Sequence, residues 1–147
     1  MDLSYGHEYD TFREEVKSFI QANQHKQPGP GDGLKSPALR EWQRLLIENG
    51  YHSRTISSEY GGFGAEPDII KSRIIAEEFG AARMHRGFNG QGVTMLTPVL
   101  LEMGSETQKQ TFVGPTINAE IIWCQGYSEP GAGSDVECLS TMAELDG

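Results

Sequence analysis

The sequence predicts a mainly α fold, with a helical bundle over residues 1–119 followed by the first strands of an incomplete β domain over residues 120–147. Before residue 120, apolar residues recur at helical spacing in several segments, and Ser, Pro or Gly stand where helices begin or end. From Glu120 onward, a short β-branched and aromatic run bounded by turn-forming residues is typical of a buried strand. The chain has 147 residues, which is enough for one compact core.

The first two helices are predicted from their caps and apolar stripes. Thr11 and Glu14 match a capping box, which predicts a helix start at this point. A Pro/Gly-rich loop over residues 28–33 follows, and Ser36 then serves as the N-cap of a second helix that ends near Gly50. The expected buried residues are Phe12, Val16, Phe19 and Ile20 in the first helix, and Leu39, Trp42, Leu45 and Leu46 in the second.

Three further helices are expected before residue 120. Residues 67–82 carry apolar side chains on more than one face, which predicts a mostly buried helix. Residues 97–103 restart a helix that Gly104 ends, and residues 92–96 are expected to form a preceding turn that Pro98 kinks. Ser105 and Gln108 form a second capping box, which opens a short helix ending near residues 113–115.

Composition excludes several classes of protein. The formal net charge is −9 and the pI is about 4.8, which argues against a nucleic-acid-binding protein, since these need a basic face. No apolar run approaches the roughly 18–20 residues of a membrane span. Cys124 and Cys138 have no metal-ligand spacing, so neither a metal site nor a disulfide scaffold is expected. Cys124 is expected to be an inert buried thiol, which fits a reducing, cytoplasmic setting.

The segment from Trp123 to Val136 has the composition of an anion-binding loop. Gly131 and Gly133 allow the backbone to bend and to approach a ligand closely, and Ser134 adds a hydroxyl donor. Asp135 has the wrong sign for a phosphate and is expected to bond the backbone of its own loop. The segment matches neither the dinucleotide-binding fingerprint nor the P-loop. From these residues alone, a cofactor loop and a plain surface turn both remain open.

The same segment resembles the signature of the acyl-CoA dehydrogenase family of flavoenzymes, which has the form Y-S-E-P-G-A-G-S-D. Residues Tyr127–Val136 match it without a gap. Residues 58–64 resemble the family's P-x-E-Y-G-G-x-G segment, although Ser57 stands where proline is usual. The resemblance covers roughly residues 9–145, and it implies the family's N-terminal helical domain followed by the start of its middle β domain.

The resemblance implies that flavin adenine dinucleotide (FAD) binds along this segment. Ser128 would bond the edge of the isoalloxazine ring, Gly133 and Ser134 would hold the pyrophosphate, and Ser134 would also face the acyl-CoA. Glu129 is interpreted as structural. The residues expected at the cofactor are Gln125, Gly126, Tyr127, Ser128, Gly131, Gly133 and Ser134.

The implied reaction is oxidation of the Cα–Cβ bond of a CoA thioester to the enoyl-CoA, with electron-transfer flavoprotein or a similar acceptor as electron partner. The family's catalytic carboxylate lies in a C-terminal helical domain, so no residue of this chain is expected to be catalytic, and the chain alone is expected to be inactive. Residues 146–147 resemble half of a hairpin turn, which suggests the front part of a longer protein, and homo- or hetero-oligomers are expected. The alternative is a truncated, non-catalytic homologue or partner subunit that acts as an assembly or binding module.

Overall fold

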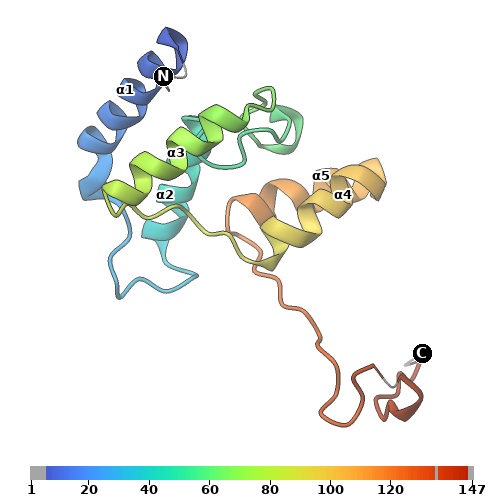
Figure 1. The fold of residues 1–147 in the computed structure, drawn as a ribbon. Coiled ribbons are helices and arrows are strands. Elements are labelled where there is room, and N and C mark those ends of the chain that lie inside the picture. The colour runs from blue at the N-terminus through green and yellow to red at the C-terminus, as the bar shows by residue number, and fades with distance from the viewer. Residues whose placement is uncertain (1–5, 135, 146–147) are drawn as a thin grey trace.

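A computed structural model describes residues 6–134 and 136–145, and its described part is mostly helical (Figure 1). Five α-helices are joined by short 3-10 turns and one π turn, and the segment after α5 runs away from the helices. This confirms the predicted mainly α fold. The elements are α1 (His7–Asn23), η1 (Gln24–Lys26), α2 (Pro37–Glu48), η2 (Ser58–Tyr60), α3 (Ile69–Ala81), η3 (Gly92–Leu96), α4 (Thr97–Met103), α5 (Glu106–Ile117) and η4 (Val136–Cys138).

Two apolar clusters hold the helices together. The larger cluster lies among α1, α2 and α3, with Trp42 and Phe79 almost completely buried. Its buried members are Val16, Phe19, Ile20, Trp42, Leu46, Ile74, Ile75, Phe79 and Met84. The smaller cluster joins the end of α2 to α5 through Ile47, Val113 and Ile117. The predicted stripes of the first two helices are thus buried, apart from the partly buried Phe12 and Leu45.

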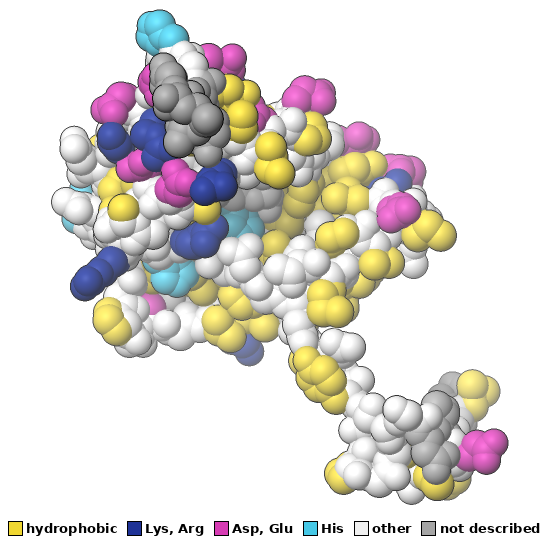
Figure 2. All heavy atoms as spheres, in the orientation of Figure 1, with side chains coloured by type: hydrophobic (Ala, Val, Ile, Leu, Met, Phe, Trp, Pro, Cys, Tyr) yellow, Lys and Arg dark blue, Asp and Glu magenta, His cyan; other side chains and the backbone are white. Residues whose placement is uncertain are grey.

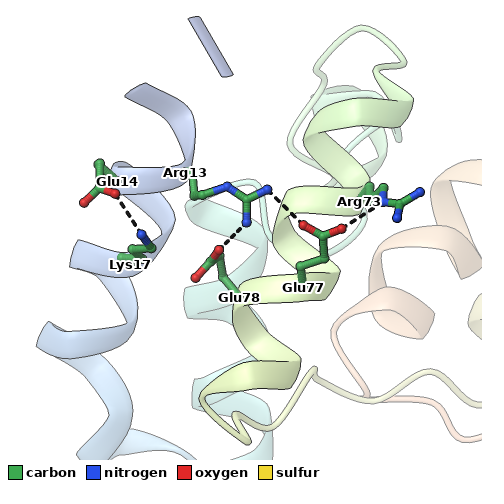
Figure 3. Close-up of polar contacts among 6 residues, drawn as sticks. All are labelled: Arg13, Glu14, Lys17, Arg73, Glu77 and Glu78. Carbon is green, nitrogen blue, oxygen red and sulfur yellow. Dashed lines mark hydrogen bonds and ion pairs between the residues drawn. The ribbon is translucent and has the colours of Figure 1, made fainter. Parts of the chain in front are cut away.

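Ion pairs add a polar seam between α1 and α3 (Figure 3). The Arg13 guanidinium pairs with Glu78 and, at 2.9 Å, with Glu77. Arg73 pairs with the same Glu77 at 2.8 Å. Such pairs near solvent contribute roughly 0–1 kcal/mol each, so the apolar cluster beneath them carries most of the packing energy.

Helix boundaries agree with the predicted caps at three ends and differ at others. Ser36 accepts a hydrogen bond from the Leu39 amide, Ser105 and Gln108 form the reciprocal capping box, and Gly50 ends α2 with a φ of 72°. The capping box at Thr11 is wrong, because α1 already begins at His7. Acidic side chains in that first turn favour an earlier start through the helix dipole.

Helices α3 and α5 differ from expectation in burial and in length. Helix α3 starts after Asp68, whose carboxylate accepts from two backbone amides, and it is buried on one face only, since Ile69 is 86% exposed. Helix α5 continues through Pro115 to Ile117. We attribute the extra turn to burial, because Thr116 and Ile117 are both fully buried.

The strand expected after residue 120 does not form in the described residues. Residues 122–128 have no regular secondary structure, and the nearest pairing is an isolated antiparallel bridge between Glu129 and Ala132. A strand needs a partner for its backbone groups, and no second strand is present among residues 6–134 and 136–145. Cys124 is exposed, so the expected buried thiol is also wrong.

Candidate functional site

The candidate site begins where the chain leaves α5. The amides of Glu120 and Ile121 both bond to the Pro115 carbonyl, at 2.9 and 3.2 Å. Ala119 is fully buried and has a left-handed φ of 56°, which ends the helical path of α5. The signature segment (Trp123–Val136) therefore starts from a fixed position on the helical body.

Trp123 anchors this segment to the helices. Its indole N–H donates to the Thr116 hydroxyl at 2.9 Å, and its ring packs edge-on against Phe112 with centroids 5.7 Å apart. A Cβ atom placed on Gly92 would lie only 2.3 Å from Cδ1 of Trp123, so the indole rests directly on the backbone of η3. The contacts join η3, α5 and the signature segment into one unit.

An apolar groove of about 290 Å³ lies beside this anchor. One wall comes from η3 and α4, and the other comes from the signature segment. Met95 and Val99 are each more than half exposed. Figure 2 shows hydrophobic side chains gathered over α4 and over the narrow neck that leads to the C-terminal segment. The groove is lined by Gln91, Met95, Leu96, Val99, Trp123, Cys124 and Gln125.

The predicted cofactor residues lie along an exposed segment and do not converge on an enclosed pocket. Gln125 lines the groove, and the Tyr127 hydroxyl accepts a hydrogen bond from the Gln91 amide at 2.7 Å. A Cβ atom on Gly131 or Gly133 would meet nothing within 4 Å, so the backbone there is open to a ligand. All seven residues are exposed: Gln125, Gly126, Tyr127, Ser128, Gly131, Gly133 and Ser134.

The Glu129 carboxylate is engaged by residues further along the same segment. Its carboxylate accepts hydrogen bonds from the backbone amides of Ser140 and Thr141, at 2.9 and 2.6 Å, and from the Thr141 hydroxyl. The Thr141 hydroxyl is the main cause that lowers the pKa of Glu129, because it stabilises the charged form. The backbone-tying role expected of Asp135 lies outside the described residues, and Glu129 fills a role of this kind.

Buried polar side chains fix the loop that leads into η3. Gln43 is fully buried and donates from Nε2 to the Ile117 carbonyl at 2.7 Å, while its Oε1 accepts from the Phe88 amide at 2.7 Å. The neighbouring Trp42 donates its indole N–H to the His85 carbonyl at 2.7 Å. Helix α2 thus connects the loop over residues 85–91 to the end of α5. This loop ends at Gln91, which lines the groove.

His52 belongs to the same buried network. Its Nε2 lies 3.1 Å from both the Phe88 carbonyl and the Asn89 amide oxygen, and its Nδ1 lies 2.8 Å from the Ser53 hydroxyl. Two acceptors face Nε2, so this nitrogen carries the proton of the neutral ring. Burial lowers the pKa of His52 below its usual 6.5, although its bonds to Phe88 and Asn89 partly oppose the shift.

We expect His52 to make folding stability fall in mild acid. An unfolded chain takes up a proton on His52 as pH drops below 6.5, whereas the folded chain does so only at lower pH. The free energy of unfolding contributed by this residue is therefore fully present above pH 6.5 and decreases below it. Urea unfolding of the wild type and of His52→Gln, at pH values from about 7.5 to about 5, measures this. If the free energy of unfolding changed with pH by the same amount in both proteins, His52 would not be the source of the effect.

Sequence reasoning found the signature loop but missed the groove and the network. Gln91 lies in a loop-like segment of the sequence, and Gly92 was expected only to begin the turn over residues 92–96. Gln43 lies on the apolar face of the amphipathic helix α2 and is fully buried there, whereas glutamine is usually exposed. A signal was present in Gly92, since a glycine at a helix start often marks a close approach by another chain segment.

The described part of the chain contains neither a cluster of metal ligands nor a membrane-spanning helix. Among them, no group of three or more His, Cys, Asp or Glu side chains is placed to hold a metal ion. None of the helices in residues 6–134 and 136–145 has both the length and the apolar composition needed to cross a bilayer.

Comparison with known proteins identifies the helical part. Residues 6–120 match the family described as "Acyl-CoA dehydrogenase, N-terminal domain". The chain is 32% identical over 148 aligned residues to acyl-CoA dehydrogenase IpdE1 of Mycolicibacterium smegmatis. This alignment covers 95% of the chain and 37% of that protein. Glutaryl-CoA dehydrogenase of Desulfococcus multivorans is 29% identical over 149 residues, which cover all of this chain and 38% of the relative.

Solved structures agree with these matches. The structure of the Tcur3481-Tcur3483 steroid ACAD aligns with this chain at a TM-score of 0.64 and 27% sequence identity. The alignment covers all of this chain and 38% of the chain in that structure. The ChsE4-ChsE5 complex from Mycobacterium tuberculosis aligns at a TM-score of 0.63 and 27% sequence identity. This alignment covers all of this chain and 37% of the chain in that structure. This chain thus spans less than two fifths of the relatives that it matches.

The family match and the solved structures define the helical body as an N-terminal domain of the acyl-CoA dehydrogenase type. The chain belongs to the acyl-CoA dehydrogenase family, and residues 6–120 correspond to its N-terminal domain.

Proposed function

We propose that this chain is the N-terminal part of a FAD-dependent acyl-CoA dehydrogenase, which oxidises the Cα–Cβ bond of a CoA thioester to the enoyl-CoA. In this proposal residues 1–119 form the helical domain, residues 120–147 begin the middle β domain, and the protein is cytoplasmic. The observation that carries it is the gap-free signature over Tyr127–Val136, which begins shortly after residue 120, where the family match ends. Electron-transfer flavoprotein or a similar protein would accept the electrons.

The residues present fit a flavin nucleotide. Gly131 and Gly133 are exposed and open to close approach, which suits a pyrophosphate bound by backbone amides. Ser128 and Ser134 are exposed hydroxyl donors on the same segment, and the Glu129 carboxylate is engaged elsewhere. Bound flavin supplies the redox chemistry, while the chain's own residues bind and orient it. The adjoining apolar groove would hold the acyl group of the thioester, with Gln125 at the boundary between the two.

A titration of FAD against the purified chain, followed by flavin fluorescence anisotropy, tests this assignment. We expect weak but saturable binding, because these residues form only one wall of the family's flavin site. Gly133→Val should weaken binding at least about ten-fold, since a branched side chain blocks approach to the backbone. Gly31→Val is the matched control, because Gly31 is also exposed with nothing within 4 Å, and it should leave the affinity unchanged.

An activity assay of the same chain completes the test. With a CoA thioester and an artificial electron acceptor, we expect no turnover by the chain alone, because the family's catalytic carboxylate belongs to a different domain. Turnover without a second polypeptide would contradict this expectation. An equal loss of FAD affinity in Gly31→Val would show that the effect of Gly133→Val does not identify Gly133 as a FAD-binding residue.

A second candidate function is a non-catalytic partner or assembly module. It is favoured by the solved structures of similar fold, whose names each pair two different proteins, ChsE4 with ChsE5 and Tcur3481 with Tcur3483. Homo- or hetero-oligomers are compatible with either candidate. Absence of saturable FAD binding by the chain, with all variants folded, would favour the module.

A further inference from the structure

Three contacts hold the Trp123 side chain in place in the apolar groove. Thr116, which is fully buried, accepts its indole proton at 2.9 Å. Phe112 packs against the ring at an interplanar angle of 76°. The backbone of Gly92 lies beneath the Cδ1 edge, where even one methyl group would lie at 2.3 Å. The indole therefore cannot retreat toward η3 or α5 when a ligand enters the groove.

The opposite wall of the groove is adaptable. Met95 and Val99 are 54% and 57% exposed, and a methionine side chain changes its shape at low cost. Because Met95 can move aside and Trp123 cannot, the position of the indole sets the width that an apolar ligand can have. Cys124 and Gln125 continue the same wall toward the signature loop.

We propose that Trp123 is a specificity-determining residue that limits the width of the acyl group accepted by this groove. The proposal rests on the proposed function only in taking the occupant to be the acyl part of a CoA thioester. The wild-type groove favours a narrow, straight acyl chain over a ring, and a smaller residue at position 123 admits the wider group. Pocket size of this kind discriminates by about ten-fold or more for each carbon-sized mismatch.

The test compares binding of two thioesters of different width to the chain without added FAD. Displacement of the fluorescent fatty acid cis-parinaric acid by octanoyl-CoA and by cyclohexanecarbonyl-CoA measures a ratio of dissociation constants. In the wild type this ratio should favour octanoyl-CoA. We expect Trp123→Leu to shift the ratio toward the ring compound by at least about ten-fold, and Trp123→Phe to give an intermediate value.

Two controls separate a groove effect from general loss of structure. Met103→Leu alters an exposed side chain on the same helix as Val99, but outside the groove lining, and should leave the ratio unchanged. Far-UV circular dichroism establishes that each variant is folded, and Trp123→Phe retains an aromatic ring if the leucine variant does not fold. A ratio that is unchanged across the folded Trp123 variants, or a wild type that binds neither thioester, overturns the proposal. The FAD titration is independent of either result, so failure of the flavin assignment is distinguishable.

Discussion

Replacing Gln43 with leucine should lower the free energy of unfolding by about 3 kcal/mol. The side chain is fully buried and bonds both the Phe88 amide and the Ile117 carbonyl, each at 2.7 Å. Leucine is of similar size, so little cavity forms, but both backbone groups lose their partner. An unsatisfied buried donor or acceptor costs roughly 1–3 kcal/mol, and two are created here.

Urea unfolding followed by far-UV circular dichroism measures this effect, and hydrogen exchange locates it. We expect the Phe88 amide to lose protection, because Gln43 is its hydrogen-bond acceptor. Arg44→Leu is the matched control, since it places leucine on the next, exposed position of α2, where its cost should be within about 0.5 kcal/mol. If both variants lose the same stability, helix α2 and not the network explains the loss.

The importance of Gln43 could not be predicted from the sequence, because its partners lie 45 and 74 residues away along the chain. Periodicity identifies which face of α2 is apolar, but it cannot show that one polar residue on that face meets two distant backbone groups. The features that were predicted correctly are local. Ser36 and Ser105 bond amides three residues ahead, so the sequence contains both partners.

The errors have physical causes of the same kind. The capping-box pattern at Thr11 competes with a longer helix, and Thr11 instead donates its hydroxyl proton to the His7 carbonyl within α1. The expected strand after residue 120 depends on a partner strand, which the described residues do not contain. Secondary structure that depends on non-local pairing is therefore the least predictable part of this chain.

The candidate site divides in the same way. The signature loop could be recognised because its residues are consecutive and unusual in composition. The groove was not found, because residues 91–99 and 123–125 meet only after the chain has turned through α5. The contact that brings these two segments together is that of Trp123 with Gly92, and it can be tested directly.

Gly92→Ala should destabilise the fold by about 2 kcal/mol and detach the signature segment from the helices. The added Cβ would lie 2.3 Å from Cδ1 of Trp123 and 2.9 Å from the Cγ2 methyl of Thr116, which is closer than real carbon atoms approach. Neither neighbour can move freely, because the Trp123 indole donates a hydrogen bond to Thr116 and Thr116 is fully buried. Overpacking of this kind typically costs 1–3 kcal/mol.

The Gly80→Ala variant is the matched control for this prediction. Gly80 lies within α3, is exposed and has nothing within 4 Å of an added Cβ, so the same substitution should there stabilise the helix by roughly 0.5–1 kcal/mol. Urea unfolding should therefore give shifts of opposite sign for the two variants. Faster hydrogen exchange at the amides of Glu120 and Ile121, which bond the Pro115 carbonyl, in Gly92→Ala, with no change in Gly80→Ala, would locate the damage where the signature segment leaves α5. A stabilising or neutral effect at Gly92 would mean that the indole does not rest on this backbone, and the argument for a rigid groove wall would then fail with it.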